Sequence, residues 1–212
     1  MSHLAKVCFL DNDITYKLAA FQLFDEAIDT LQIKKTNLQV LPTAKFFFRG
    51  KQQKKGKSPD PVLAAVIELV HACTSASVGQ DEASSEELIQ LKKIEGIHEG
   101  EAALIAATRS QADFLLLTGD KNCMKALSVI PEAIYQRLCG RVVCLEQIIL
   151  KLIKVKGFEF VRDRILPMVS CDRSLQFCFG YSTPAPEESV ILGLTGCIDE
   201  IEQHAPDLLA DL

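Results

Sequence analysis

Apolar segments of strand length alternate with amphipathic segments of helix length along most of the chain. Residues 5–10 are apolar and stop at Asp11, which is typical of a buried strand, and residues 14–31 repeat apolar side chains at helical spacing. Two further apolar segments, 114–118 and 141–145, also end at polar residues. This alternation predicts an α/β fold, a three-layer sandwich with a central parallel sheet flanked by helices.

The segments between these strands have helix and loop patterns. We expect one helix from Pro61, with proline in its first turn, and another from Gly100, whose alanines allow close packing on a sheet. Residues 38–48 have a strand-like or mixed pattern. The lysine-rich segment 49–61 and the polar segment 74–87 are predicted to be loops.

The pattern changes at about residue 157. Residues 1–156 contain all the predicted strands, and residues 157–212 are predicted to form a helical C-terminal extension packed on them. Pro184 and Pro186 mark a linker inside this extension. A length of 212 residues suits one principal core with a smaller appendage.

Composition narrows the class of protein. The chain is 48% apolar, but no apolar run approaches the ~20 residues of a bilayer span, and the N-terminus lacks the apolar core of a secretory signal. We therefore expect a globular, cytoplasmic protein without a membrane partner.

The eight cysteines form no CxxC pair, which predicts reduced core thiols. The four histidines, at 3, 71, 98 and 204, show no ligand spacing with a cysteine cluster, which predicts no zinc site.

One segment is strongly basic although the whole chain has a net charge of -5. That net charge argues against nonspecific coating of nucleic acid over the entire surface. The basic segment follows three phenylalanines at 46–48 and contains Lys51, Lys54, Lys55 and Lys57. Two interpretations remain open: a solvated loop whose preceding aromatics belong to the core, or a surface that contacts substrate phosphates.

Acidic residues follow three of the predicted strands. Asp11, Asp120 and Glu146 lie at strand ends, and Glu101 begins the helix that precedes the Asp120 strand. Ligands gather at the carboxyl ends of strands in a parallel sheet, so these residues are expected to converge. Converging carboxylates repel one another, and a divalent cation relieves the repulsion; oxygen ligands predict Mg²⁺ or Mn²⁺. Taken singly, each acid is better explained as a helix cap or a turn residue.

Three motifs resemble those of the PIN-domain nucleases in their order and context. FLDNDITYKL around Asp11 resembles the family's hydrophobic-Asp-x-Asn/Ser opening, and GEAALIAA at Glu101 resembles its Gly-Glu helix start. LLLTGDK at Asp120 resembles its Thr-x-Asp turn. The resemblance covers residues 5 to about 150, while GRVVCLEQ and the last sixty residues are similar to a bacterial subgroup of the family.

The resemblance implies a PIN-like, metal-dependent nuclease that hydrolyses phosphodiester bonds, with RNA as substrate and Mg²⁺ or Mn²⁺ as cofactor. It implies that Asp11, Glu101 and Asp120 are the catalytic metal ligands. A homodimer and an antitoxin-like partner protein are further expectations from the family. Weaker candidates for the metal site are Asp13, Glu146, Asn122 and Glu68. Lys121 is a candidate phosphate contact, with a solvated turn lysine as the alternative.

Two other functions compete with this interpretation. Asp11-x-Asp13-x-Thr15 after an apolar strand matches the nucleophile motif of haloacid-dehalogenase-type phosphatases, in which Asp11 would be the nucleophile and Asp13 the acid. That class needs a second acid soon after Asp120, where the sequence reads KNCMKAL. A non-catalytic PIN-like module that binds RNA or a protein partner is the other alternative. The nuclease requires the carboxylates of Asp11, Glu101 and Asp120 to lie close enough to share one ion, and carboxylates that lie far apart would favour the non-catalytic module.

Overall fold

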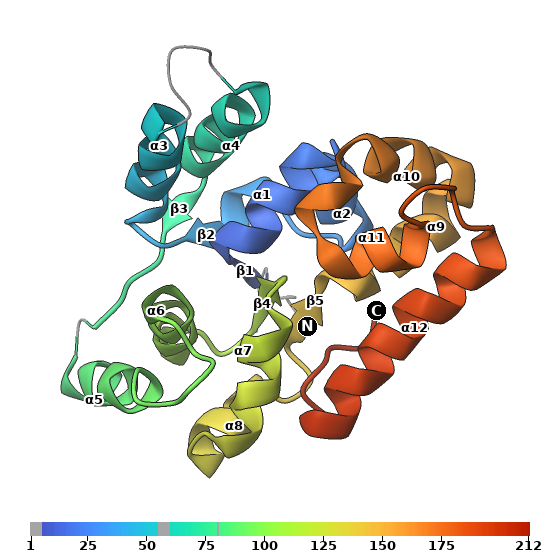
Figure 1. Ribbon diagram of the computed structural model, residues 1–212. Helices are drawn as coiled ribbons and strands as arrows, with labels where there is room; N and C mark the ends of the chain where they lie inside the picture. The colour runs from blue at the N-terminus through green and yellow to red at the C-terminus, as the bar shows by residue number, and fades with distance from the viewer. Residues whose placement is uncertain (1–5, 55–59, 80) are drawn as a thin grey trace.

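Five short strands form one parallel sheet at the centre of the protein in the computed structural model, which describes residues 6–54, 60–79 and 81–212 (Figure 1). The sheet order is β3-β2-β1-β4-β5. This confirms the α/β class and the parallel sheet flanked by helices. The strands are β1 (Val7–Leu10), β2 (Leu38–Val40), β3 (Thr74–Ser75), β4 (Phe114–Thr118) and β5 (Val142–Cys144).

The neighbouring strands β1 and β4 are apolar except for Thr118 at the end of β4, because both faces of the sheet are covered. β1 pairs with β4 in a register that sets Leu10 opposite Leu117. These two leucines face one hydrophobic core, whereas Phe9 and Phe114 face the other. The two phenylalanine rings meet edge to face, with their centroids 6.0 Å apart.

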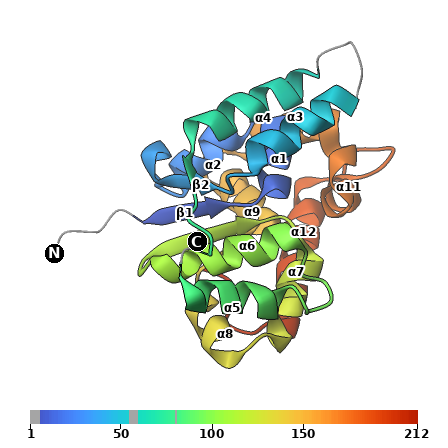
Figure 2. The same ribbon diagram turned by 90° about the vertical axis from the view of Figure 1, so that its left-hand side faces the viewer.

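Helices cover the sheet in two layers (Figure 2). The helices form two groups: the first group shares one hydrophobic core with the sheet, and the second group shares the hydrophobic core on the other face. The first group is α1 (Asn12–Ala20), α2 (Phe24–Thr30), α3 (Ala44–Lys54), α4 (Pro61–Ala72) and α9 (Leu145–Lys156). The second group is α5 (Glu82–Leu91), α6 (Glu99–Ala107), α7 (Lys121–Ala126) and α8 (Glu132–Leu138).

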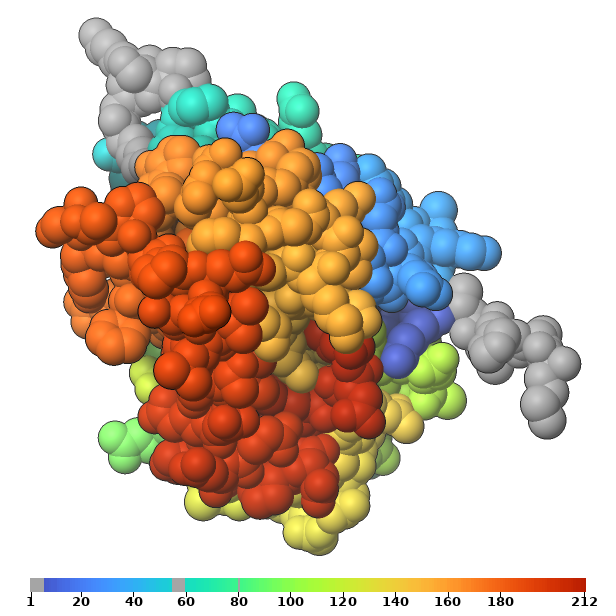
Figure 3. Space-filling model, turned by 90° about the vertical axis from the view of Figure 1, so that its right-hand side faces the viewer, coloured from blue at the N-terminus to red at the C-terminus, as the bar shows by residue number. Residues whose placement is uncertain are grey.

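The last part of the chain is helical and covers one side of the molecule (Figure 3). It contains α10 (Phe158–Ile165), α11 (Arg173–Phe179) and α12 (Glu187–His204). Its end returns to the sheet edge, where the Ala210 N–H donates to the carbonyl of Val142 in β5 at 2.8 Å. Among the described helices, none has the length and apolar character needed to cross a membrane.

Capping explains why α4 begins where the sequence predicts. Pro61 occupies the first turn, and the Asp60 side chain accepts the N–H groups of Val62 and Leu63 at 2.9 and 3.2 Å. Proline has no N–H to satisfy at this position, and its fixed φ suits a helix start. The predicted helix is therefore confirmed.

The single helix predicted for residues 14–31 is wrong, because the segment forms two helices. α1 ends at Ala20, and Gln22 adopts a left-handed conformation with φ of 54°. The Leu23 N–H then donates to the Leu18 carbonyl at 2.9 Å, which closes the helix end. Apolar spacing continues through this turn because both helices pack on the same core.

The prediction of a loop from residue 49 is wrong for residues 49–54, which complete α3. The three preceding phenylalanines also lie in α3 rather than in a strand. Phe48 is fully buried, whereas Phe46 is 62% exposed and Phe47 is 44% exposed. The polar segment 74–87 contains the short strand β3 and the beginning of α5.

Candidate metal centre

The sheet order brings two acid-bearing strand ends together. From β1 the chain runs outward through β2 and β3, then crosses to β4 on the other side of β1. Such a switch point opens a crevice at the carboxyl ends of the two central strands. Asp11 follows β1 directly and Asp120 lies two residues beyond β4, so both residues border this crevice.

Thr118 links the two strand ends. Its Oγ1 donates to Asp11 Oδ2 at 3.4 Å and accepts the N–H of Asp120 at 3.2 Å. Asp11 also donates its own N–H to the Leu117 carbonyl at 3.0 Å. The positions of the two acids are therefore fixed by backbone pairing of neighbouring strands.

The start of α6 adds two ligand groups. Glu101 Oε2 accepts the backbone N–H of His98 at 2.6 Å, which holds the carboxylate at the helix start. One ligand atom from each of His98, Glu101 and Asp120 lies within 4.8 Å of the other two. This spacing suits a cation whose bonds to its ligands are about 2.0–2.4 Å long. Within the described residues it is the one such group found.

His98 was not expected at this site. The sequence around His98 has no zinc-type spacing with cysteines, and the ligand groups near His98 are instead the carboxylates of Glu101 and Asp120. His98 and Glu101 are three residues apart, and side chains at this spacing are neighbours on a helix. The His-x-x-Glu spacing is therefore the sequence signal that identifies this histidine.

Asp11 lies beside the group rather than within it. The group of atoms that share 4.8 Å spacing does not include Asp11. Asp11 nevertheless lines a small cavity together with Glu101 and Thr118. Its charge acts on Glu101, and the charge of Asp120 acts on Asp11. All three predicted acids thus gather at one sheet edge, with Asp11 outside the tightest set.

Burial and repulsion raise the pKa of two of these acids. Burial, followed by the charge of Asp13 and more weakly that of Asp120, raises the pKa of Asp11 to about 6. Burial, followed by the charges of Asp120 and Asp11, raises the pKa of Glu101 to about 7 against the opposing hydrogen bond from His98. A cation bound among these groups would favour their charged forms.

Three helices begin at the site. Asp11, His98 and Asp120 are the N-cap residues of α1, α6 and α7. Asp120 Oδ1 accepts the N–H groups of Asn122 and Cys123 at 2.8 and 3.0 Å, so Asp120 is a capping residue as well as a candidate ligand. The backbone N–H groups of helix starts favour nearby anions and partly offset the crowding of carboxylates.

Asp13 is paired with a cation instead of joining the group. Lys17 Nζ lies 2.5 Å from Asp13 Oδ2 and 2.7 Å from Asp172 Oδ2. The Asp13 carboxylate packs over Gly119, where an added Cβ would lie 2.6 Å from Oδ2. Lys17 therefore bridges two carboxylates, that of Asp13, which lies over Gly119 in the turn after β4, and that of Asp172 in the C-terminal part.

Glu146 and Lys121 form a separate buried ion pair. Lys121 Nζ lies 2.8 Å from Glu146 Oε1 and 2.7 Å from Ser174 Oγ. Glu146 is 1% exposed, and its Oε2 has no hydrogen-bond partner among the described residues. These contacts hold the Lys121 side chain between α7, α9 and α11, away from the open surface that a phosphate contact requires.

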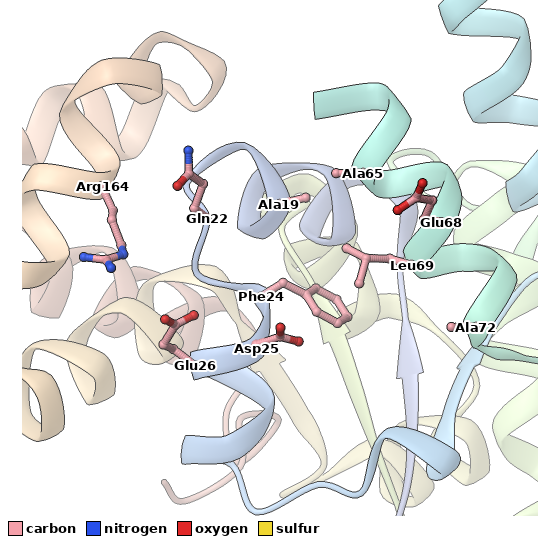
Figure 4. A pocket seen from close by; sticks show the side chains of 10 residues that line it. All are labelled: Ala19, Gln22, Phe24, Asp25, Glu26, Ala65, Glu68, Leu69, Ala72 and Arg164. Atoms are coloured by element: carbon pink, nitrogen blue, oxygen red, sulfur yellow. The ribbon is translucent and has the colours of Figure 1, made fainter. Parts of the chain in front are cut away.

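The two remaining weaker candidates do not extend the ligand set. Glu68 lines a different hollow between α1, α2, α4 and α10, where Arg164 lies on the opposite side (Figure 4). Asn122 is exposed and contributes its backbone N–H to Asp120. No side-chain contact of Asn122 with the described acids is present.

The first residues of the predicted basic segment lie in α3, where lysines and aromatic side chains form one surface. Lys51 Nζ lies 4.5 Å from the ring centroid of Phe47 and 5.7 Å from that of Tyr16. Lys54 is exposed in the last turn of α3. Lys55 and Lys57 lie outside the residues that the structure describes.

The ligand set combines an imidazole nitrogen with carboxylate oxygens. Carboxylates suit Mg²⁺ and Mn²⁺, while an imidazole ligand favours Mn²⁺ or a later transition metal over Mg²⁺. The residues present therefore fit a divalent cation.

Comparison of the chain with protein-family models, with curated proteins and with solved structures finds no match. The resemblance to PIN-domain nucleases accordingly rests on the motifs around Asp11, Glu101 and Asp120.

Proposed function

We propose that the protein is a metal-dependent nuclease that hydrolyses phosphodiester bonds in RNA. The observation that carries this proposal is the gathering of His98, Glu101, Asp120 and Asp11 at the switch point of a parallel sheet. The four residues come from three separate parts of the sequence. Their order and context match the motifs that the PIN-domain resemblance identifies, with His98 as an addition.

We propose Mn²⁺ or Mg²⁺ as the cofactor, held by His98, Glu101 and Asp120. When bound, the cation would lower the pKa of an attacking water and neutralise charge on the scissile phosphate. Asp11 borders the same cavity as Glu101, and its raised pKa of about 6 suits a group that accepts a proton from water near neutral pH. Thr118 orients Asp11 for this role through its hydroxyl.

The surroundings of the site favour a polyanionic substrate. The helices α1, α6 and α7 begin at the site, and the partial positive charge of helix N-termini favours phosphate oxygens nearby. The α3 surface adds lysines beside exposed aromatic rings, a combination that suits the backbone and bases of a single strand. The net charge of -5 makes such a local basic surface necessary for binding RNA.

The phosphatase alternative is less well supported. That mechanism requires Asp13 as a proton donor and acceptor close to the nucleophile Asp11. Here the Asp13 carboxylate forms an ion pair with Lys17, whose Nζ lies 2.5 Å from Asp13 Oδ2. The non-catalytic binding module shares the same side chains with the nuclease, so an activity measurement must separate the two.

Cleavage of a labelled single-stranded RNA, with and without Mn²⁺, tests the proposal. We expect Mn²⁺-dependent cleavage that falls at least about 100-fold in Asp120→Asn, since a metal contributes several kcal/mol and about 1.4 kcal/mol is tenfold in rate. Asparagine is as good an N-cap as aspartate, so this variant keeps the start of α7.

Glu99→Gln is the matched control for this experiment. Glu99 lies in the same turn as Glu101, but its side chain is 86% exposed and pairs with Lys92 at 3.2 Å. We expect its cleavage rate to stay within about twofold of wild type. Equal rates in Asp120→Asn and Glu99→Gln would assign the activity to another site. Metal binding without any RNA cleavage would favour the non-catalytic module.

A further inference from the structure

Two cysteines face one another where α11 packs against α12. An added Cβ at Gly193 of α12 would lie 2.9 Å from the Sγ of Cys178 in α11, so only glycine allows this close approach. Cys197 lies one helical turn beyond Gly193 on the same face of α12. Each of these two thiols shifts the pKa of the other through its side chain. The two sulfur atoms are therefore neighbours across the helix pair.

A partly buried cation, Lys121, lies beside this pair. The Lys121 ammonium, which is held by Glu146 at 2.8 Å and by Ser174 at 2.7 Å, lies close enough to Cys197 to lower the pKa of that thiol. Ser174 lies four residues before Cys178 on α11, so the lysine reaches the same helix face. An ammonium at a sulfur atom stabilises the thiolate, which is the reactive form of cysteine.

The environment of Cys197 differs from that of the other cysteines. The Cys178 side chain, together with the Lys121 ammonium, lowers the pKa of Cys197 to about 6 against the opposing effect of burial. Burial instead raises the pKa of the Cys8, Cys123 and Cys144 thiols. Cys197 is also partly exposed, whereas Cys178 is buried behind it. A small oxidant can therefore reach Cys197 first.

We propose that Cys197 and Cys178 form an oxidation site that a hydroperoxide converts into a disulfide. The Cys197 thiolate attacks one oxygen of hydrogen peroxide, the O–O bond breaks, and hydroxide leaves to give a sulfenic acid. The Cys178 sulfur then attacks the Cys197 sulfur, and the S–O bond breaks with loss of water. The two thiols lose two electrons, and one peroxide becomes two waters. This proposal does not depend on the nuclease function.

Site-resolved labelling of the full-length protein tests the first step. The protein is treated with iodoacetamide at pH 7, and the alkylation rate of each cysteine is read by peptide mass spectrometry. Cys139 is the internal reference, because it is also partly exposed but burial raises its pKa. Cys197 is mostly thiolate at pH 7 whereas Cys139 is mostly thiol, and the lower nucleophilicity of a low-pKa thiolate offsets only part of this difference, so we expect Cys197 to react about fivefold faster.

Mild hydrogen peroxide tests the second step in the same protein. We expect a Cys178–Cys197 linked peptide under non-reducing conditions, which dithiothreitol removes. The linked peptide should persist in Cys139→Ser and disappear in Cys197→Ser. Alkylation of Cys197 no faster than that of Cys139, or peroxide treatment that yields no Cys178–Cys197 linkage, would overturn the proposal. Both readouts come from the wild-type protein, so they stand even if a variant folds poorly.

Discussion

Glu101 and Asp11 bind protons more tightly in the folded chain than ordinary carboxyl groups do. Their pKa values of about 7 and about 6 lie above those of exposed glutamate and aspartate. The folded state therefore holds more protons than the unfolded state between pH about 4 and 7. The stability that these protons provide is complete below this window and is lost as pH rises through it.

This sign predicts that the metal-free protein becomes less stable between pH 5 and pH 8. We expect the free energy of unfolding in urea and EDTA to fall by about 1–3 kcal/mol, less than the full shifts imply because the site is partly open to solvent. Glu101→Gln should flatten this dependence, and Glu99→Gln should retain it. A Glu101→Gln protein with the wild-type slope would contradict the pKa shift.

The sequence predicted the positions of some side chains at the site and not those of others. Asp11 and Asp120 were predictable because an acid after a buried parallel strand has one available location, the carboxyl edge of the sheet. The pair of Asp13 with Lys17 has a local signal, the i,i+4 spacing on a helix, whereas the contact of Lys17 with Asp172, 155 residues further on, has none. The His98 signal is local, since it is the His-x-x-Glu spacing.

Among the helices, α3 combines the features expected of a surface that binds a single-stranded nucleic acid. It carries the exposed Phe46 and Phe47 together with the lysines near them. The sequence pattern favoured a loop because α3 buries only Ala44 and Phe48, which is too narrow an apolar stripe to indicate a helix. Aromatic residues in succession also favour a strand by propensity.

A salt series tests the role of α3 in the proposed RNA binding. We expect Lys51→Gln with Lys54→Gln to weaken RNA binding and to lower the slope of log affinity against log salt by about 0.7 for each phosphate that the lysines no longer neutralise. The measurement uses the Asp120→Asn background, so that RNA is not cleaved. Lys154→Gln with Lys156→Gln, two exposed lysines in the last turn of α9, is the control and should leave the slope unchanged. Identical slopes for both pairs would make α3 a solvated helix only.

Two glycines in α12 give a prediction about helix packing. An added Cβ at Gly196 meets nothing within 4 Å, whereas at Gly193 it would press on Cys178. Gly196→Ala should stabilise the protein by about 1 kcal/mol through helix propensity. Gly193→Ala should destabilise it by about 1–3 kcal/mol through overpacking. Urea unfolding measures both, and similar effects from the two substitutions would argue against the close approach of α11 and α12.

At the scale of the whole molecule, the C-terminal helices share cores with the sheet. Val161, Leu175 and Val190 belong to the same hydrophobic cluster as β1 and β4 side chains. Ile201 and Leu208 belong to the cluster on the other face. The ion pair of Lys17 with Asp172 and the bond from Ala210 to Val142 add polar links. Residues 157–212 are thus continuous with the core of residues 1–156.

The sheet and its helical layers could be predicted because apolar runs bounded by acids and glycines alternate with helical periodicity. The two-residue strand β3 and the break at Gln22 could not, since no glycine, proline or long apolar run marks either of them in the sequence. Neither could the burial of Lys121 and Glu146 against one another, because the contact joins α7 to α9 across the turn after β5. The local sequence pattern identified most of the helices and strands. Which of their polar side chains reach the crevice depends on how those helices and strands pack together.

The most direct test of the metal centre is a crystal structure of the protein grown with Mn²⁺ and measured at the manganese absorption edge. We expect one anomalous peak bonded to His98, Glu101 and Asp120, at about 2.0–2.3 Å from each ligand atom, and no such peak in Asp120→Asn. Manganese bound elsewhere, or absent from this sheet edge while the acids remain together, would contradict it.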